Sequence, residues 1–588
     1  MIRNFIRYAA LGGLVVGLAA CDLAIANPNQ GDTERVIGSP EDAEALLSTY
    51  YKRWHSGVYG STGNLEGMAN NMSLMNYSSL ANNCQNNHIP FTGYANPNTP
   101  GNVCAGEQAR LYQYMGEVNR VASNVLSQMD AGLTLGTTDK ATDARNLRAR
   151  AWGEFLRGLS LGYTAMIYDS SAIVSPNMST TPADCVDAGG VCTGALRNYT
   201  EVLDSALAAF DRALTYTNAT TVTGTGGFPI PNSWLPSPTD WTTANFTRLI
   251  RSYRARIRAN VARSAAEPVD WAAVVADAQN GFTADHEVTT STTAGPFISW
   301  RQQYDTRDTW HQMTPFIIGM ADNSGSYAAW LSIPLSNRGA GNAAFFMTTP
   351  DLRFPQGATR AAQQADFLIS QCEVANTDCK RYFVNRPSGS DNYSGDSWAQ
   401  SNYDFVRFRS WARRGDGGQA RNGNTPIFTL AELDLLQAEG LYKLGATNDA
   451  AVATLINKTR TRGMVGGAAQ GGGLPAVTAA NRAAPVAGGA DCVPKVPVPA
   501  GNGTATLTCG NLWEALKYEK RIETAYTHFA PWYLDSRRWD DLPKDTPLFW
   551  ATPYQDLQAR GRSTADLYGT GPGQKAPNSV APGSAYGW

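Results

Sequence analysis

Cys21 is the residue whose chemistry the sequence defines most clearly, because a signal-like segment precedes it. Arg3 and Arg7 supply a cationic start, an apolar run follows over 8–17, and the segment ends in LAAC at Cys21. This order is typical of a secretory signal peptide over 1–20, since the apolar run is too short to span a bilayer as a mature helix. Small residues before a cysteine resemble a bacterial lipobox, in which the thiol takes a diacylglycerol. We therefore expect acyl lipid on Cys21, with each buried CH₂ stabilising membrane attachment by about 0.8 kcal/mol.

Two features of this segment leave alternatives open. An ordinary cleaved signal peptide followed by a chance cysteine would give the same pattern. Asp22, directly after the cysteine, retains lipoproteins in the inner membrane of some bacteria, whereas other lineages sort by different rules. Residues 21–38 are rich in Asn, Gly and Asp, and we expect them to form a lipidated flexible tether.

The other eight cysteines fall into four couples that are local in sequence. An even number of cysteines outside a reducing cytosol predicts disulfides, each worth about 2–3 kcal/mol for loops of this size. Nearest-neighbour pairing is the simplest choice, although sequence alone does not fix the connectivity. A cysteine-ligated zinc site is disfavoured because no C-x-x-C spacing occurs, and we expect no metal site. The couples are Cys84 with Cys104, Cys185 with Cys192, Cys372 with Cys379, and Cys492 with Cys509.

The sequence carries no local signature of catalysis. The five histidines show no H-E-x-x-H spacing, and there is no G-x-S-x-G, phosphate loop or dinucleotide fingerprint. We therefore expect no catalytic residues and no cofactor other than the lipid. A glycosidase with two carboxylates brought together by the fold leaves no such signature and stays open as an alternative.

Composition excludes some partners and suggests others. The 588 residues carry a net charge of −2 and a pI near 6.3, so no electrostatic field suits nucleic acid. Aromatic residues make up 10% of the chain, with 15 Trp and 25 Tyr. This abundance suggests a binding surface, although any single ring is more often a core residue. No second long apolar run occurs, so the lipid would be the only membrane contact.

Helical periodicity dominates the elements that must position these groups. Ser39 as N-cap, followed by Pro40 and two acidic residues, opens a first helix that continues to about residue 55. Two short helices that meet at Gly445 look like one unit of a tetratricopeptide-like repeat. Further helices are expected over 106–130, 139–168, 198–216, 243–266, 269–282, 428–444, 448–462 and 510–527.

These elements predict a mainly α fold of tetratricopeptide-like helical repeats, with long irregular loops and few short strands. We expect a single globular domain over 39–550, followed by a surface tail over 551–588. The domain divides into an N-terminal helical part (39–285), a loop-rich part (286–425) and a C-terminal helical part (426–550).

Charged residues on two groups of helices are expected to be structural. The arginines of the 243–266 helix surround it and predict a solvated face rather than a phosphate site. Ion pairs between helices are expected among Arg460, Arg462, Arg521, Glu439, Glu519 and Glu523.

Segments of the C-terminal third carry a resemblance to a known family. The stretches 433–441 (LDLLQAEGL) and 455–463 (LINKTRTRG), the helix 516–523 (LKYEKRIE) and the element 532–539 (WYLDSRRW) are similar to the late helices of the SusD/RagB family. The helix 148–168 looks like the family's early Arg/Ala/Tyr helix. With the lipobox at the head, the resemblance covers nearly the whole mature chain.

The resemblance implies a SusD-like, lipid-anchored outer-membrane protein at the cell surface. Such a protein binds an oligosaccharide, or a peptide, as a nutrient and acts as a lid for a SusC-type TonB-dependent transporter; it is not an enzyme. A helical-repeat lipoprotein that scaffolds an envelope complex is the main alternative, and a secreted glycan-cleaving enzyme is a weaker one.

A sugar site needs flat aromatic rings beside planar polar groups, because sugars present an apolar C–H face and a rim of hydroxyls. The loop-rich part offers this chemistry, and the early loop around residue 76 is where family members often place ligand contacts. The alternative for each ring is that it packs beneath a loop. The expected ligand-binding residues are Asn76, Tyr77, Trp300, Arg301, Tyr304, Trp310 and Trp330.

Overall fold

A computed structural model gives the fold of the protein and describes most of the region after the tether. The described residues are 37–60, 65–77, 98–139, 142–176, 194–219, 228–235, 240–290, 312–334, 337–338, 345–367, 379–386, 401–407, 423–501 and 504–560.

Long helices make up the N-terminal part, and capping side chains explain where several of them begin. The Ser39 hydroxyl accepts a hydrogen bond from the Asp42 N–H at 3.1 Å, as its N-cap position predicts. Asn198 forms a capping box with Glu201 at the start of the fourth long helix. The helices are α3 (Pro40–Tyr59), α4 (Leu65–Met72), α5 (Ala105–Ala131), α6 (Ala144–Ile167), α7 (Tyr199–Thr217), α8 (Thr243–Asn260) and α9 (Trp271–Gln279).

The C-terminal part adds a second group of helices. Three of them correspond to the helices expected over 428–444, 448–462 and 510–527, while the shorter ones were not expected from the sequence. The α-helices are α11 (Pro315–Ile318), α12 (Ser326–Ser332), α13 (Arg360–Asp366), α14 (Leu430–Leu444), α15 (Asp449–Arg460), α16 (Leu512–Thr524), α17 (Pro531–Arg538) and α18 (Tyr554–Ala559), with 3₁₀ turns η4 (Gly319–Ala321), η9 (Ala446–Asn448), η10 (Ala479–Arg482) and η11 (Gly489–Asp491).

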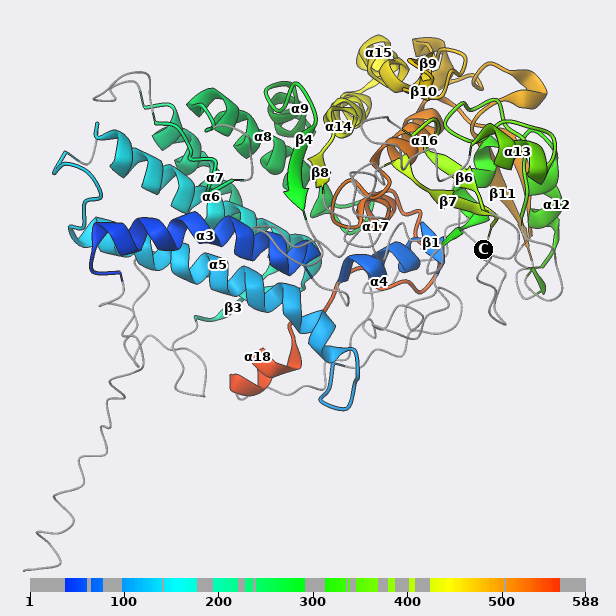
Figure 1. The fold of residues 1–588 in the computed structure, drawn as a ribbon. Helices are drawn as coiled ribbons and strands as arrows, with labels where there is room; N and C mark the ends of the chain where they lie inside the picture. The colour runs from blue at the N-terminus through cyan, green and yellow to red at the C-terminus, as the bar shows by residue number, and fades with distance from the viewer. Residues whose placement is uncertain are drawn as a thin grey trace, which may run out of the picture.

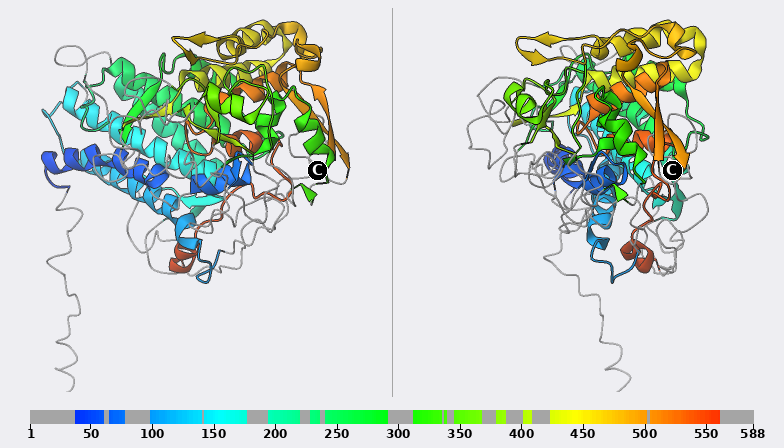
Figure 2. Two further views of the ribbon diagram at one scale, coloured as in Figure 1. Left: turned by 45° about the vertical axis from the view of Figure 1, so that its right-hand side comes forward. Right: turned by 90° about the vertical axis from the view of Figure 1, so that its right-hand side faces the viewer.

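Consecutive helices pack side by side through most of the chain. Helix α3 lies along α5, α5 packs on α6, and the series continues through α7, α8, α9 and α14 to α15 and α16 (Figure 1). The segment of α15, β9 (Met464–Val465) and β10 (Ala468–Ala469) keeps to the upper edge in the turned views as well (Figure 2). The predicted mainly helical class is confirmed, and the helices contact their neighbours as they do in helical-repeat proteins.

Helix α6 lies at the centre of the N-terminal part and is buried on all sides over most of its length. Close approach of its neighbours requires glycine at two positions. A Cβ on Gly158 would lie 2.8 Å from the Phe210 ring, and a Cβ on Gly162 would lie 2.5 Å from Ile257. A larger side chain at either position would push α7 or α8 away from α6.

Strands are short and occur only as two-stranded antiparallel pairs in the described part of the chain. They hold loop ends together rather than forming a layer of their own. The pairs are β1 (Asn76–Tyr77) with β5 (Gln312–Met313), β2 (Ser170–Ala172) with β3 (Leu196–Asn198), β4 (His286–Thr290) with β8 (Gly423–Phe428), β6 (Phe383–Asn385) with β7 (Tyr403–Phe405), β9 (Met464–Val465) with β10 (Ala468–Ala469), and β11 (Lys495–Gly501) with β12 (Thr504–Cys509).

Two large hydrophobic cores lie in the two halves of the molecule. The first runs from Ile37 through the N-terminal helices to Trp550, so both ends of the expected globular domain share one core. The second joins the described pieces of the loop-rich part to α16 and to Trp532 of α17. Helices of the C-terminal part therefore contact both cores and join the two halves of the molecule.

A buried ion cluster, here called the Arg353 cluster, links the loop-rich part to α16. The Arg353 guanidinium contacts Asp351, Glu519 and Glu523 at 2.7–2.9 Å, and all four side chains are essentially inaccessible to solvent. Arg460 of α15 completes the cluster, 3.5 Å from Glu519. The expected pairing of Arg460 with a carboxylate of α16 is therefore confirmed.

Glu439 and Arg521 pair with other residues than expected, and the expected ion pair of Arg462 is not found among the described residues. Glu439 pairs with Lys520 and Arg538, at 2.9 and 2.7 Å. Arg521 pairs with Asp541 at 2.6 Å rather than with a glutamate of the repeat helices. Burial alone would raise the pKa of Glu439, but the two cations hold that pKa well below its usual value.

The expected solvated face of the arginine-rich helix is wrong for two residues of α8. Arg256 is fully buried, donates to both oxygens of Glu432 at 2.7 Å and lies 3.3 Å from the centre of the Phe428 ring. Arg254 is also buried and contacts Asp277 of α9 at 2.5–2.7 Å. Carboxylate partners on α9 and α14 balance the buried charges of these arginines, which offsets part of the cost of removing them from water.

Cysteine pairing is visible for part of the framework. Cys492 and Cys509 form a disulfide at the base of the β11–β12 hairpin, as nearest-neighbour pairing predicts. Cys104 and Cys379 each take part in a disulfide as well. The remaining cysteines, Cys84, Cys185, Cys192 and Cys372, lie outside the described residues.

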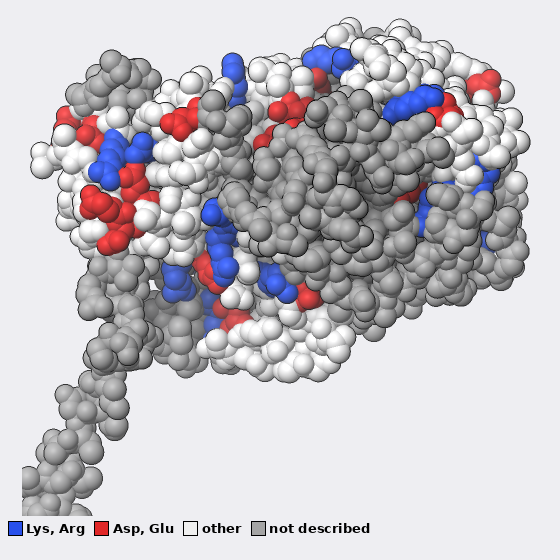
Figure 3. Space-filling model, in the orientation of Figure 1, with Lys and Arg blue, Asp and Glu red and all other residues white. Residues whose placement is uncertain are grey.

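The surface of the described part mixes both charge signs. On the face shown in Figure 3, lysines and arginines alternate with acidic side chains in small groups. None of the helices in the described ranges is long and apolar enough to cross a bilayer.

Candidate functional site

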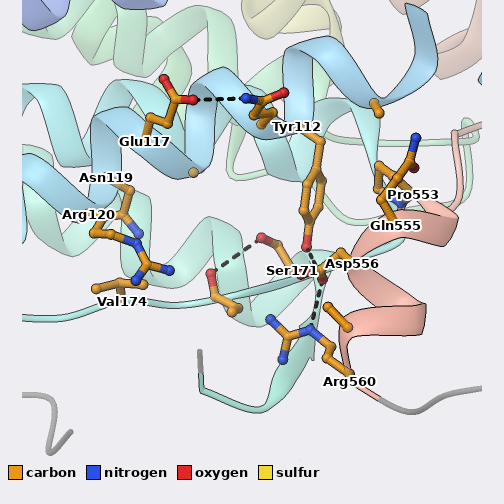
Figure 4. A pocket seen from close by; sticks show the side chains of 15 residues that line it. Tyr112, Glu117, Asn119, Arg120, Ser171, Val174, Pro553, Gln555, Asp556 and Arg560 are labelled. Atoms are coloured by element: carbon orange, nitrogen blue, oxygen red, sulfur yellow. Dashed lines mark hydrogen bonds and ion pairs between the residues drawn. The ribbon is translucent and has the colours of Figure 1, made fainter. Parts of the chain in front are cut away.

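A groove between α5 and α18 is a cavity of the described structure that is lined by apolar, amide and charged side chains. Its volume is about 440 Å³, and the strand β2 and the residues after it form its third side. We call it the α5–α18 groove (Figure 4). Its lining residues are Ala109, Tyr112, Gln113, Gly116, Glu117, Asn119, Arg120, Ser171, Ala172, Val174, Pro553, Gln555, Asp556, Ala559 and Arg560.

The helical repeat of α5 explains how one helix forms a whole wall. Positions 109, 112, 113, 116 and 120 recur at spacings of three and four and therefore lie on one face. Two of the five are small, Ala109 and Gly116, and they leave the hollow. A Cβ placed on Gly116 would meet no other atom within 4 Å, so the space above this glycine is open.

A hydrogen-bonded chain of three side chains closes one end of the groove. The Tyr112 hydroxyl points from α5 toward α18 and donates to the Asp556 carboxylate at 3.1 Å (Figure 4). The Arg560 Nε donates to the same carboxylate at 2.8 Å. Burial, together with the nearby Asp556 charge, raises the pKa of Tyr112. The hydroxyl therefore stays protonated and serves as a hydrogen-bond donor.

The opposite end of the groove is more open and carries charged and amide groups. Glu117 accepts from Gln113 at 3.0 Å and from Arg53 at 2.5 Å, which fixes its carboxylate. Arg120 is exposed and makes no hydrogen bond or ion pair within the described part of the chain. Its guanidinium is therefore available to a bound molecule (Figure 4).

Hydrogen bonds to the segment before α18 hold this helix in place. The Asn98 side chain donates to the Thr552 carbonyl at 2.8 Å and accepts from the Tyr554 N–H at 2.8 Å. The Asp169 carboxylate accepts from the Thr552 N–H at 2.8 Å. The first residues of the expected surface tail thus form a wall of the groove, because polar groups far back in the sequence fix their backbone.

The groove offers the chemistry of a binding site for a polar molecule with apolar faces. Small apolar side chains such as Ala109 and Val174 lie beside amide, carboxylate and guanidinium groups. Planar polar groups form paired hydrogen bonds with hydroxyls, and the Tyr112 ring adds an aromatic edge. No cluster of three potential metal ligands occurs among the described residues.

Most of the ligand-binding residues expected from the sequence cannot be placed. Cys21 and the four residues Trp300, Arg301, Tyr304 and Trp310 lie outside the described residues. Their roles stay predictions.

Asn76 and Tyr77 form strand β1, which pairs with Gln312 and Met313 of β5. The Asn76 side chain is buried, with 1% of its surface exposed, and its amide has no hydrogen-bond partner among the residues that the structure describes. In this structure Asn76 is therefore an interior residue at the edge of the second core, closed to bulk solvent.

Trp330 lies in the second core, as the packing alternative for loop aromatics predicts. Its ring is stacked near Tyr327, with centroids 6.0 Å apart, and meets the Phe316 ring edge-on at 4.9 Å. The Arg338 guanidinium lies 4.4 Å from the ring centre. Trp330 is buried in this structure, with 9% of the residue exposed, and its role in ligand binding stays a prediction.

The residues that form the α5–α18 groove were missed by sequence reasoning. Tyr112 lies within an expected helix, and the small residues on its face are a weak signal of a hollow. Asp556 and Arg560 fall in a segment whose composition indicates only a surface tail. Their approach to Tyr112 depends on the contacts of Asn98, which no local pattern reveals.

The known proteins that this chain matches are solved structures. No family model matches the sequence, and no curated protein matches it. The chain is similar to a SusD-like carbohydrate-binding protein from Bacteroides fragilis, with 13% identity over 86% of this chain and 87% of that chain and a TM-score of 0.48.

Two further solved structures carry the same family name. A SusD superfamily protein from Bacteroides thetaiotaomicron shares 12% identity over 90% of this chain and 98% of that chain, with a TM-score of 0.45. One from Bacteroides vulgatus shares 13% over 89% and 92%, with a TM-score of 0.40. The family that the C-terminal motifs resemble is thus the family to which these solved structures belong.

Proposed function

We propose that this protein is a lipid-anchored outer-membrane protein at the cell surface that binds an oligosaccharide, or a peptide, in the α5–α18 groove. It holds the nutrient without changing it covalently and serves as a lid for a SusC-type TonB-dependent transporter. Lipid on Cys21 attaches the protein to the membrane through the tether of residues 21–38.

The lining of the α5–α18 groove is the observation that carries the proposal. It sets one aromatic side chain, Tyr112, beside planar hydrogen-bonding groups on a wall of small residues. Oligosaccharides need this combination, because their hydroxyls require paired donors and acceptors while their C–H faces require apolar contact. A volume of about 440 Å³ also falls in the usual range for small-molecule sites.

The anchor and the transporter partner are supported by the sequence. The lipobox places a lipid at one end of a polar tether, which would let a rigid body swing over a transporter. The C-terminal motifs, similar to those of the SusD/RagB family, imply the partner. The stacked helices provide the rigid face that such a partner would need.

Filling the groove tests ligand binding with little risk to the fold. Gly116→Trp places a large ring in the hollow, where a Cβ meets no other atom. Gly106→Trp is the matched control, because Gly106 lies on the same helix, is equally open and does not line the groove. Isothermal titration of purified mature protein with a panel of oligosaccharides and peptides should detect binding by the wild type and the control, with at least a tenfold loss for Gly116→Trp, equal to about 1.4 kcal/mol.

Two outcomes would contradict the proposal. Equal binding by Gly116→Trp and Gly106→Trp would exclude the groove as the site. Release of products in proportion to the protein concentration, detected by chromatography, would favour the alternative that the protein is a glycan-cleaving enzyme. Cys21→Ser should move the protein from the membrane fraction to the soluble fraction, and wild-type protein should copurify with a β-barrel transporter from native membranes.

A further inference from the structure

A second cavity lies where α14 begins and where α15 and α16 end, away from the α5–α18 groove. Its volume is about 470 Å³. Thr459 and Glu523 are buried and form its floor, whereas Asp285 and Arg462 are exposed at its mouth. We call it the α14–α15 cavity.

Charged side chains of both signs dominate the lining of this cavity. Three cationic and three acidic side chains balance one another, and Leu430 and Ala431 supply a small apolar wall. The charged residues are Arg407, Lys458, Arg462, Asp285, Asp434 and Glu523.

Four of these charges are already paired within the wall. Arg407 contacts Glu523 at 2.8 Å and stacks 4.0 Å from the centre of the Tyr382 ring. Lys458 contacts Asp434 at 2.6 Å. These pairs are held by protein partners and fix the shape of the cavity.

The two remaining charges have opposite signs and are available at the mouth. The Arg462 side chain makes no hydrogen bond or ion pair within the described part of the chain. The Asp285 carboxylate accepts one backbone hydrogen bond, from the Leu430 N–H at 2.8 Å, and interacts electrostatically with Arg407, while its second oxygen has no hydrogen-bond donor among the described residues. A ligand that pairs with both groups would carry an anionic group for Arg462 and a cationic group for Asp285.

We propose that the α14–α15 cavity binds a zwitterion of amino-acid or dipeptide size, with its carboxylate on Arg462 and its ammonium group on Asp285. An arginine fork matches a carboxylate through two parallel hydrogen bonds, and an aspartate oxygen accepts readily from an ammonium group. The cavity volume accommodates a dipeptide, and its neutral balance of charges disfavours a ligand with net charge. This proposal does not depend on the α5–α18 groove.

Blocked dipeptides test the two charges separately. Titrations of the mature protein, monitored by calorimetry or ligand-observed NMR, would compare the binding of alanylalanine with that of its N-acetyl form and of its C-terminal amide. Each blocked form lacks one charge, and each should bind about tenfold more weakly than the free dipeptide, as expected for loss of one charge-assisted pair. Free alanine in a parallel titration distinguishes an amino-acid site from a dipeptide site.

Two variants assign each charge to its partner. Arg462→Gln should weaken binding of alanylalanine and remove the preference over the C-terminal amide, while the preference over the N-acetyl form remains. Asp285→Asn should give the converse pattern and still accept the Leu430 N–H. Arg197→Gln and Asp204→Asn are exposed controls on other elements and should bind like the wild type.

Equal affinity for free and blocked dipeptides would overturn the proposal, as would an unchanged preference in both cavity variants. Absence of binding by alanine and alanylalanine up to their solubility would also overturn it. None of these three results would affect the oligosaccharide test, because Gly116→Trp alters a different cavity.

Discussion

Replacement of Arg353 is the sharpest test of how the two halves of the molecule are joined. Arg353 donates six hydrogen bonds of 2.7–3.2 Å to the carboxylates of Asp351, Glu519 and Glu523. All four side chains are at most 1% exposed. Arg353→Met keeps much of the volume and removes the charge.

The magnitude follows from what each carboxylate retains. Glu523 keeps Arg407 at 2.8 Å and Glu519 keeps Arg460 at 3.5 Å, whereas Asp351 keeps two neutral donors, the Tyr518 hydroxyl at 2.7 Å and the backbone N–H of residue 353 at 3.0 Å. Three cations and three anions therefore become two cations and three anions, while all three carboxylates stay buried. Leaving one buried charge unpaired costs about 3–5 kcal/mol, and we expect a loss of about 4 kcal/mol at pH 7.

The pH dependence of this loss has a definite sign. Burial already raises the pKa of Glu519, while Arg353 opposes that rise. Without Arg353 the pKa of Glu519 rises further, so the folded variant binds a proton more tightly than the unfolded chain. A raised carboxyl pKa gives stability that is present at low pH and lost as the pH increases. The difference between wild type and variant should therefore shrink from pH 7 to pH 5.

Guanidinium denaturation followed by tryptophan fluorescence measures these differences. Arg197→Met is the matched control, because its partner Glu201 is 3.7 Å away and both side chains are about half exposed, so the loss should stay below about 1 kcal/mol. Arg353→Met with Glu519→Gln should be more stable than Arg353→Met alone, since the second change removes the unpaired charge. A loss below about 1 kcal/mol for Arg353→Met, or a double variant less stable than the single one, would refute the reasoning.

Three further predictions concern burial and the disulfide. Burial, together with a nearby guanidinium, lowers the pKa of His286 to about 3, so the wild type should lose about 1.4 kcal/mol of stability per pH unit below pH 6.5. His286→Phe should abolish this loss, as measured by denaturation at pH 7, 6 and 5. Burial raises the pKa of Glu514 to about 7, so Glu514→Gln should gain about 1–2 kcal/mol relative to wild type between pH 5 and pH 8, and a constant difference would contradict this. Replacement of both Cys492 and Cys509 by alanine should cost about 3 kcal/mol, given a separation of 17 residues, and added reductant should then have no further effect on that hairpin.

Helix positions were predictable because their signals are local. Ser39 and Asn198 supply caps within three residues of the backbone groups they satisfy. The helix expected over 428–444 is observed as Leu430–Leu444, and the one expected over 106–130 as Ala105–Ala131. Spacing of apolar residues and caps fixes such elements before any tertiary contact forms.

Buried charges and the groove were not predictable because their partners are distant in sequence. Arg256 looks like one of several surface arginines until Glu432, 176 residues away, lies beside it. Tyr112 and Asp556 are 444 residues apart and meet only after α18 docks. A pattern confined to one helix cannot reveal whether the opposite wall supplies a carboxylate or solvent.

The aromatic and basic element WYLDSRRW shows why a recognisable motif does not disclose its physical role. Arg537 of this element donates to the carbonyls of Met166, Asn260 and Leu548 at 2.5–2.9 Å. Two of these carbonyls lie in the last turns of α6 and α8, where no intrahelical donor remains and a cation is favoured by the helix dipole. Because a residue of any type supplies a backbone carbonyl, the sequence does not indicate which helix ends accept hydrogen bonds from Arg537. The motif can therefore be seen in the chain, but its function of tying α17 to two helix ends becomes visible only in the fold.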